Sequence, residues 1–133
     1  MIYVLDASAM IAYLRDEAGA DVVEQALLDK TGRCLAHAIN LCEVFYDLIR
    51  SGGESDALSA INDLYAMGVG EHTDFDKLFW QEAGRLKAQG RIALADCLAI
   101  TLTNRVGGTL LTSDHGELDR IATAGTCSIT FIR

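Results

Sequence analysis

Short apolar runs alternate along the chain with longer segments whose apolar residues recur at helical spacing. The short runs are typical of strands buried in a parallel sheet, and the longer segments are typical of amphipathic helices. We expect strands at residues 2–5, 34–38, 69–72, 109–112 and 128–132. We expect helices at residues 7–14, 20–28, 40–51, 54–67, 75–88, 94–106 and 118–124.

Strands that alternate with helices predict parallel βαβ units, and hence a three-layer α/β/α sandwich around a central parallel sheet. The chain has 133 residues, of which 50% are hydrophobic and 23% are charged. We expect one domain, residues 1–133, whose core is large enough to need no disulfide bonds. The composition excludes a disordered, collagen-like or coiled-coil chain.

The chain is acidic, with a formal net charge of −8. This charge gives no long-range attraction to nucleic acid. An acidic sum can nevertheless contain a local cluster of carboxylates whose charge a bound cation neutralises. The positions of the individual acids in the predicted elements decide whether such a cluster can form.

Cysteine and histidine residues are scattered, with no CxxC pair, which argues against a zinc site. Each cysteine has apolar neighbours in the sequence, so we expect reduced core residues at Cys34, Cys42, Cys97 and Cys127. No apolar run approaches the ~18 residues of a membrane span, and the chain begins without a leader-like segment. We expect a cytoplasmic protein without a membrane partner.

Asp6 is the only charged residue between Ile2 and Leu14, and it lies where the first strand ends and a helix begins. It can cap that helix. It also occupies the carboxyl end of a strand, where open parallel sheets bind their ligands. The sequence leaves both roles open.

Asp96 is the only charged residue between Ile92 and Asn104, and its helical neighbours are apolar. We therefore expect a buried carboxylate, which costs several kcal/mol or takes up a proton unless it has a partner. An acid in the first turn of a helix gains roughly 0.3–1 kcal/mol from the helix dipole. That gain does not explain the apolar surroundings, so we favour a functional role.

Two further acids have weaker local signals. Asp114 follows the strand at 109–112 and falls at the same sheet edge as Asp6, although alone it would be a turn residue. Glu43 lies with Asn40 and Asp47 on a polar stripe that can face water, and Asn40 is the expected cap of that helix. We expect Glu117 and Asp119 to be solvated acids.

Together, Asp6, Glu43, Asp96 and Asp114 would form a set of oxygen ligands suited to Mg²⁺ or Mn²⁺.

Four short motifs, in this order, resemble those of PIN domains, and their spacing resembles that of VapC-type toxin ribonucleases. The motifs are Val4-Leu5-Asp6-Ala7-Ser8-Ala9, Asn40-Leu41-Cys42-Glu43-Val44, Leu94-Ala95-Asp96-Cys97-Leu98-Ala99-Ile100 and Leu111-Thr112-Ser113-Asp114. The resemblance implies a parallel sheet with strand order 3-2-1-4-5 and an acidic site at its carboxyl edge. It implies that Asp6, Glu43, Asp96 and Asp114 are the catalytic, metal-binding acids and that Ser8 and Thr112 are supporting hydroxyls.

The resemblance also implies a function: a metal-dependent endoribonuclease, the toxin of a type II toxin–antitoxin system. It implies a homodimer and a VapB-like antitoxin that blocks the site with an arginine. We expect two subunits to bring arginines around adjoining sites, so that RNA meets a local positive charge; the candidates are Arg15, Arg50, Arg85 and Arg91. His115 stands where the family often has an aromatic residue, which leaves the roles of His115 and Asp119 open.

Two alternatives remain. A PIN nuclease for housekeeping RNA processing would have the same site, and the sequence does not distinguish it from a toxin. A receiver-like or non-catalytic α/β interaction module would share the layered architecture. A receiver needs paired acids after the first strand and a late lysine, whereas Asp6 stands alone and no lysine follows Lys87.

Overall fold

The computed structural model describes residues 1–133 and contains five strands and seven helices. The strands are β1 (Ile2–Leu5), β2 (Arg33–His37), β3 (Val69–His72), β4 (Thr109–Thr112) and β5 (Ile129–Phe131). The helices are α1 (Ala7–Leu14), α2 (Ala20–Leu28), α3 (Ala38–Gly52), α4 (Glu54–Ala66), α5 (Lys77–Ala88), α6 (Leu94–Val106) and α7 (Gly116–Thr123).

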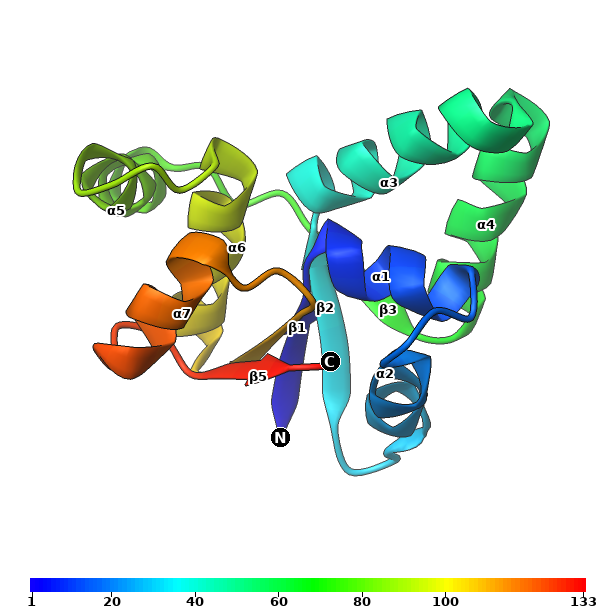
Figure 1. Cartoon of the computed structure of the whole chain (residues 1–133), viewed down its shortest axis with the longest axis horizontal. Coiled ribbons are helices and arrows are strands. Elements are labelled where there is room, and N and C mark those ends of the chain that lie inside the picture. The colour runs from blue at the N-terminus through cyan, green and yellow to red at the C-terminus, as the bar shows by residue number, and fades with distance from the viewer.

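The five strands form one parallel sheet in the order β3-β2-β1-β4-β5 (Figure 1). This confirms both the α/β class and the strand order that the resemblance implies. A receiver domain has the order 2-1-3-4-5, so the receiver hypothesis is wrong. In the observed order β1 lies between β2 and β4, and the segments that follow these three strands meet at one edge of the sheet.

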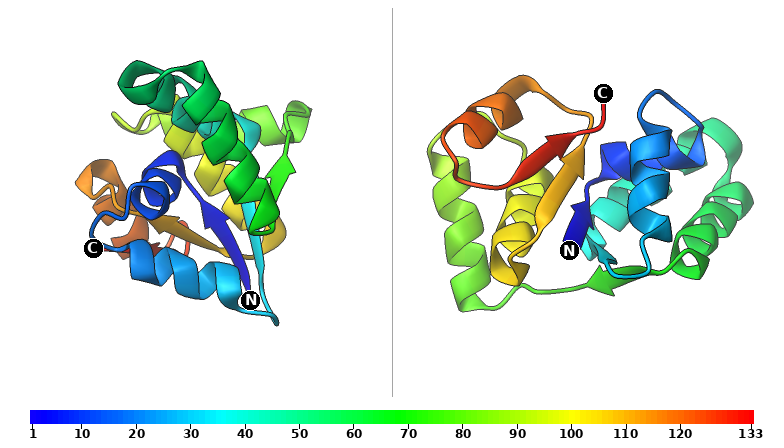
Figure 2. Two further views of the ribbon diagram at one scale, coloured as in Figure 1. Left: turned by 90° about the vertical axis from the view of Figure 1, so that its right-hand side faces the viewer. Right: turned by 90° about the horizontal axis from the view of Figure 1, so that it is seen from below.

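Helices cover both faces of the sheet, as the two perpendicular views show (Figure 2). Successive strand residues point to opposite faces, so neighbours such as Val4 and Leu5 enter different cores. Val4 and Leu110 pack with α5, α6 and α7, while Leu5 and Leu111 pack with α1, α2, α3 and α4. The two cores hold the strand ends in fixed positions.

Two expected strand boundaries shift slightly. The second strand spans Arg33–His37 instead of 34–38, and the last spans Ile129–Phe131 instead of 128–132. The cap of α3 is a larger correction, because His37 occupies the N-cap position and its Nδ1 accepts a hydrogen bond from the Ile39 amide at 3.1 Å. Asn40 therefore lies inside the first turn of α3 and does not cap it.

The cysteine prediction is wrong at one position. Cys34, Cys97 and Cys127 are buried and unpaired, but Cys42 is exposed because it lies on the outer side of α3. None of the seven helices has the length and hydrophobicity of a membrane span.

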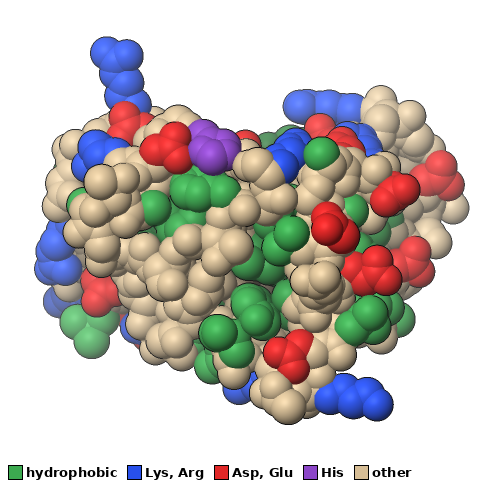
Figure 3. All heavy atoms as spheres, turned by 60° about the horizontal axis from the view of Figure 1, so that its bottom comes forward, with side chains coloured by type: hydrophobic (Ala, Val, Ile, Leu, Met, Phe, Trp, Pro, Cys, Tyr) green, Lys and Arg blue, Asp and Glu red, His purple; other side chains and the backbone are tan.

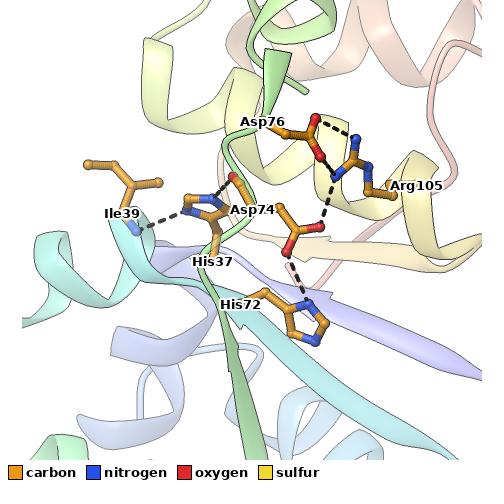
Figure 4. Close-up of polar contacts among 6 residues, drawn as sticks. All are labelled: His37, Ile39, His72, Asp74, Asp76 and Arg105. Atoms are coloured by element: carbon orange, nitrogen blue, oxygen red, sulfur yellow. Dashed lines mark hydrogen bonds and ion pairs between the residues drawn. The ribbon is translucent and has the colours of Figure 1, made fainter. Parts of the chain in front are cut away.

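A polar network holds the segment after β3 against α6 (Figure 4). The Arg105 guanidinium donates to both oxygens of Asp76 at 3.0 Å and to Asp74 at 3.2 Å. Asp76 caps α5 through the Phe79 amide. Because Nδ1 of His37 is an acceptor, its Nε2 carries the proton and donates to the Asp74 carbonyl at 2.8 Å. These contacts fix α5 beside α6.

Hydrophobic side chains gather near the middle of the face shown in Figure 3, with charged residues around the rim. Between α2 and the strands β1, β4 and β5 lies a hollow of about 270 Å³, lined by side chains that include Tyr3, Val22, Leu111 and Thr130.

Gly108, directly before β4, approaches β1 closely: an added Cβ would lie 2.7 Å from the Ile2 carbonyl oxygen. A side chain there would push β4 away from β1.

Candidate metal centre

Three aspartates from separate parts of the sequence converge at the carboxyl edge of the sheet. Asp6 follows β1, Asp114 lies beyond the end of the adjacent β4, and Asp96 lies in the first turn of α6. Each contributes a carboxylate oxygen to a group whose members all lie within 4.8 Å of one another. Asp6 is buried, Asp96 is half-buried and Asp114 is exposed, so the group opens to solvent on one side.

The two oxygens of Asp6 have different surroundings. Oδ1 accepts hydrogen bonds from the Ala9 amide at 2.9 Å and from the Ser8 hydroxyl at 2.7 Å, which makes Asp6 the N-cap of α1. Oδ2 is buried and has no donor. Both roles that the sequence left open are therefore compatible, because one oxygen caps the helix and the other is available to a cation.

Ser8 and Thr112 connect the acids across the β1–β4 boundary. The Ser8 and Thr112 hydroxyl oxygens lie 3.3 Å apart, and the Ser113 amide donates to Ser8 Oγ at 2.9 Å. The Asp114 amide donates to Thr112 Oγ1 at 3.0 Å. The two hydroxyls thus join the turn that carries Asp114 to the start of α1, which carries Asp6.

Glu43 lies outside the group of three aspartates but belongs to the same electrostatic environment. It is half-buried, and its Oε1 accepts a hydrogen bond from Nδ2 of Asn40 at 3.1 Å. Burial raises the pKa of Glu43, and the charges of Asp6 and Asp114 raise it further. The interpretation of this stripe as solvent-facing is wrong at Asn40, which is completely buried, because α3 packs its N-terminal turn against α6.

The acids lack a balancing cation within the chain. Burial and then the charges of Asp6, Asp114 and Glu43 raise the pKa of Asp96 to about 7. Burial also raises the pKa of Asp6, against the hydrogen bonds from Ser8 and Ala9. No lysine, arginine or histidine forms an ion pair with these four acids. A set of hard oxygen donors with excess negative charge fits Mg²⁺ or Mn²⁺.

The neighbouring acids Glu117 and Asp119 differ because each has a cationic partner. Glu117 pairs with Arg120 at 3.0 Å, and Asp119 lies 2.8 Å from Nδ1 of His115. His115 also donates from Nε2 to the Arg133 carbonyl at 2.9 Å and stacks on Phe131 with ring centroids 4.3 Å apart. These contacts raise the pKa of His115 and fix the turn that contains Asp114.

His115 shows what sequence analysis missed. It contacts Phe131 and Arg133, which belong to the last strand and the end of the chain. No local sequence pattern predicts these contacts. The nearest signal was its place directly after Asp114, at a position where the family often has an aromatic residue.

A pocket of about 380 Å³ adjoins the acids, and its lining includes Asp96, Asp114, His115 and Arg91. Of the four arginines expected near the site, Arg91 is the only one in this lining. Arg15 instead pairs with Asp47 at 3.2 Å, and Arg50 lies over the Tyr46 ring. Arg91 therefore lines the pocket beside the acids, from the segment that precedes α6.

Solved structures with the same fold include toxin–antitoxin proteins. VapBC2 from Rickettsia felis, bound to a DNA fragment from their promoter, matches with a TM-score of 0.77 and 18% identity, over 98% of both chains. VapC20 from Mycobacterium tuberculosis, a Sarcin-Ricin loop cleaving toxin, matches with a TM-score of 0.70 and 17% identity over 90% of this chain and 95% of that one. VapBC-5 from the same organism, of the VapBC family of toxin-antitoxin systems, matches with a TM-score of 0.62 and 18% identity over 99% of this chain and 98% of that one.

At these identities the likeness shows the fold alone. No curated protein matches the sequence. A family model, by contrast, matches residues 3–124, a range that contains Asp6, Glu43, Asp96 and Asp114. The chain therefore belongs to the PIN domain family.

Proposed function

We propose that the chain is an endoribonuclease that depends on Mg²⁺ or Mn²⁺. The observation that carries the proposal is the uncompensated group of Asp6, Asp96 and Asp114 at the sheet edge of a PIN domain. The buried, unpaired Oδ2 of Asp6 supports it independently. We further propose that residues 1–133 act as one domain.

Asp6, Asp96 and Asp114 would hold the ion, with Glu43 as the fourth metal-binding acid. A bound divalent ion would supply Lewis acidity and a lower pKa for water, which is the chemistry that in-line hydrolysis of a phosphodiester requires. Ser8 and Thr112 keep Asp6 and Asp114 in place through their hydrogen bonds. We expect products with a 5′-phosphate and a 3′-hydroxyl.

Arg91 would contact an RNA phosphate beside the scissile one. The backbone that carries it is held by Lys87, whose Nζ donates to the carbonyl of the next residue, Ile92, at 2.7 Å. Arg91 has no ion pair or hydrogen bond within the chain, so its guanidinium is available. A local cation of this kind offsets the net charge of −8 for a bound RNA.

We propose the toxin role over housekeeping RNA processing, because the structural relatives include a cleaving toxin and members of toxin-antitoxin systems. The partner would be a VapB-like antitoxin whose arginine pairs with the unbalanced acids. We propose that the protein acts in the cytoplasm. An antitoxin gene beside this one would support the toxin role, and its absence would favour the housekeeping nuclease.

We also propose a homodimer. Large apolar side chains are exposed on and beside α5, including Phe75, Leu78, Trp80 and Leu94. Exposed apolar surface of this kind is commonly covered by a second subunit. Light scattering at micromolar concentration should give about twice 14.4 kDa, and a strictly monomeric active enzyme would overturn this part of the proposal.

The nuclease proposal is tested with purified protein and a labelled RNA. We expect cleavage with Mg²⁺ or Mn²⁺ and none after EDTA is added. The Asp96→Asn variant, purified in the same way, controls for contaminating nuclease. Cleavage that persists equally in EDTA, and is absent from the control variant, would overturn the metal mechanism.

A further inference from the structure

Asn40 is a polar residue in an unusual position. Its side chain is completely buried, and its Oδ1 is one of only two buried side-chain nitrogen or oxygen atoms that lack a hydrogen-bond partner within the chain. The other is Oδ2 of Asp6, in the candidate metal centre. Buried amides in protein cores normally satisfy both ends, so an unsatisfied one indicates a requirement other than stability.

The amide nitrogen of Asn40 has acceptors on two elements that carry acids of the site, α3 and α6. Nδ2 lies 3.1 Å from Oε1 of Glu43 and 3.5 Å from the carbonyl oxygen of Ala95. Ala95 directly precedes Asp96, so one side chain contacts the helix of Glu43 and the residue beside Asp96. No other side-chain hydrogen bond joins α3 to α6.

The amide orientation follows from its neighbours. Both contacts of Nδ2 are to oxygen acceptors, and the reversed orientation would place Oδ1 against an ionised carboxylate. Neither a carboxylate nor an apolar side chain at this position could donate to Glu43. The amide of Asn40 can therefore hold the carboxylate of Glu43 in place while Glu43 is ionised.

Glu43 needs such a hold because the surrounding charges repel it. Burial raises the pKa of Glu43, and the charges of Asp6 and Asp114 raise it further, against the hydrogen bond from Asn40. No cation pairs with it, whereas Asp47 on the next turn of α3 pairs with Arg15. Without a donor, the longer glutamate side chain would turn toward solvent to separate the charges.

We propose that Asn40 is a positioning residue of the metal centre, which holds Glu43 beside the three aspartates and ties α3 to the start of α6. This inference rests on the proposed metal-dependent function and adds a residue to its site. Asn40 acts through Glu43, so its removal should have no further effect once Glu43 can no longer ligate. Its unsatisfied Oδ1 weakens the metal-free fold, as expected of a group retained for function.

The test is calorimetric titration with Mn²⁺, together with thermal melting in EDTA. Asn40→Leu and Glu43→Gln should each weaken Mn²⁺ binding by about 10- to 100-fold, and the double variant should bind no more weakly than Glu43→Gln alone. In EDTA, Asn40→Leu should melt at or above the wild-type temperature. Asn104→Ala is the matched control, because the Asn104 amide also donates to a backbone carbonyl, that of Thr126, and should leave binding unchanged.

Each outcome separates the possibilities. Wild-type affinity in Asn40→Leu, or losses that add in the double variant, would overturn the positioning role. If Asn40→Leu does not fold, Asn40→Ala removes the same donor without adding bulk and must show the same non-additive loss. Absence of Mn²⁺ binding by the wild type would instead overturn the proposed function, and this inference with it.

Discussion

Two groups of aspartates in this molecule have opposite electrostatic surroundings. Asp74 and Asp76 lie between β3 and α5 and share the guanidinium of Arg105, which donates to both (Figure 4). Asp6, Asp96 and Asp114 lie at the carboxyl edge of β1 and β4 and share no cation.

The pKa shifts follow this difference. Hydrogen bonds from Arg105 lower the pKa of Asp76, whereas burial and neighbouring acids raise the pKa of Asp96 to about 7. The carboxylates of the first group have a cationic partner within the chain, Arg105, so a structural role accounts for them. The second group brings like charges together without a cation of the chain, and this is the basis of the proposed metal centre.

The largest expected effect comes from removing a charge in the unbalanced group. Asp96→Asn keeps the shape of the side chain but removes a ligand, so RNA cleavage should fall by at least about 100-fold. Because the change also relieves repulsion, the variant should be as stable as the wild type, or more stable, in EDTA. Asp6→Asn should behave alike, since asparagine also caps helices. Wild-type cleavage would make these acids structural, and a lower melting temperature in EDTA would contradict the repulsion.

A comparison of two acids one turn apart on α3 gives the next largest effect. Glu43→Gln should weaken Mn²⁺ binding by roughly 10-fold or more, because this acid lies in the field of Asp6 and Asp114. Asp47→Asn should leave binding unchanged, since Asp47 is already paired with Arg15. Calorimetric titration of both variants checks this, and equal losses would indicate a general effect of surface charge.

Arg91 and Arg33 form a matched pair for the substrate. Arg91 lines the pocket beside the acids, whereas Arg33 begins β2 at the opposite sheet edge. Arg91→Gln should raise KM for a short RNA by about 5- to 10-fold with little change in kcat, because one phosphate contact is lost. Arg33→Gln changes the net charge equally and should leave KM unchanged. An equal rise in KM in both variants would contradict a local contact of Arg91 and would indicate a long-range effect of net charge.

The unbalanced group also predicts how stability depends on pH. The raised pKa of Asp96 means that the folded, metal-free chain binds more protons than the unfolded chain between pH 3.8 and about 7. Stability in EDTA should therefore fall as pH rises through this interval, and Asp96→Asn should flatten the slope. His115 also has a raised pKa, so His115→Gln separates its contribution near neutral pH. Urea unfolding at several pH values measures both, and an unchanged slope in Asp96→Asn would contradict the assignment.

The smallest effect on the site should come from the balanced group. Arg105→Gln leaves Asp74 and Asp76 without their cation, so the melting temperature should fall slightly. Mn²⁺ affinity should not change, because these aspartates lie outside the candidate centre. A loss of Mn²⁺ affinity would show that the two groups are coupled through α6.

The fold followed from the sequence because its signals are local. The runs at Ile2–Leu5, Val69–His72 and Thr109–Thr112 match the observed strands, and Leu94–Val106 matches α6. The order of the strands came from the resemblance, since no local pattern determines which strands pair. Asp96 was conspicuous because a charge in an apolar helix has few structural explanations.

The surroundings of α3 could not be predicted in the same way. Asn40 was the predicted cap because asparagine is a common N-cap residue. The observed cap is His37, which accepts a hydrogen bond from the Ile39 amide through a ring nitrogen. Burial of Asn40 depends on α6, which is more than fifty residues away along the chain. A helical pattern shows which residues share a face, but the neighbour that covers the face is a tertiary property.

The contact between His115 and Arg133 has a practical consequence for work with the protein. Because the Arg133 carbonyl lies 2.9 Å from His115 Nε2, any peptide fused after Arg133 would emerge beside Asp114. A polyhistidine tag at that end would bring imidazoles to the acids and compete for the metal being measured. Met1 pairs with Arg33 at the opposite, amino ends of β1 and β2, so a tag placed before Met1 leaves the centre unobstructed.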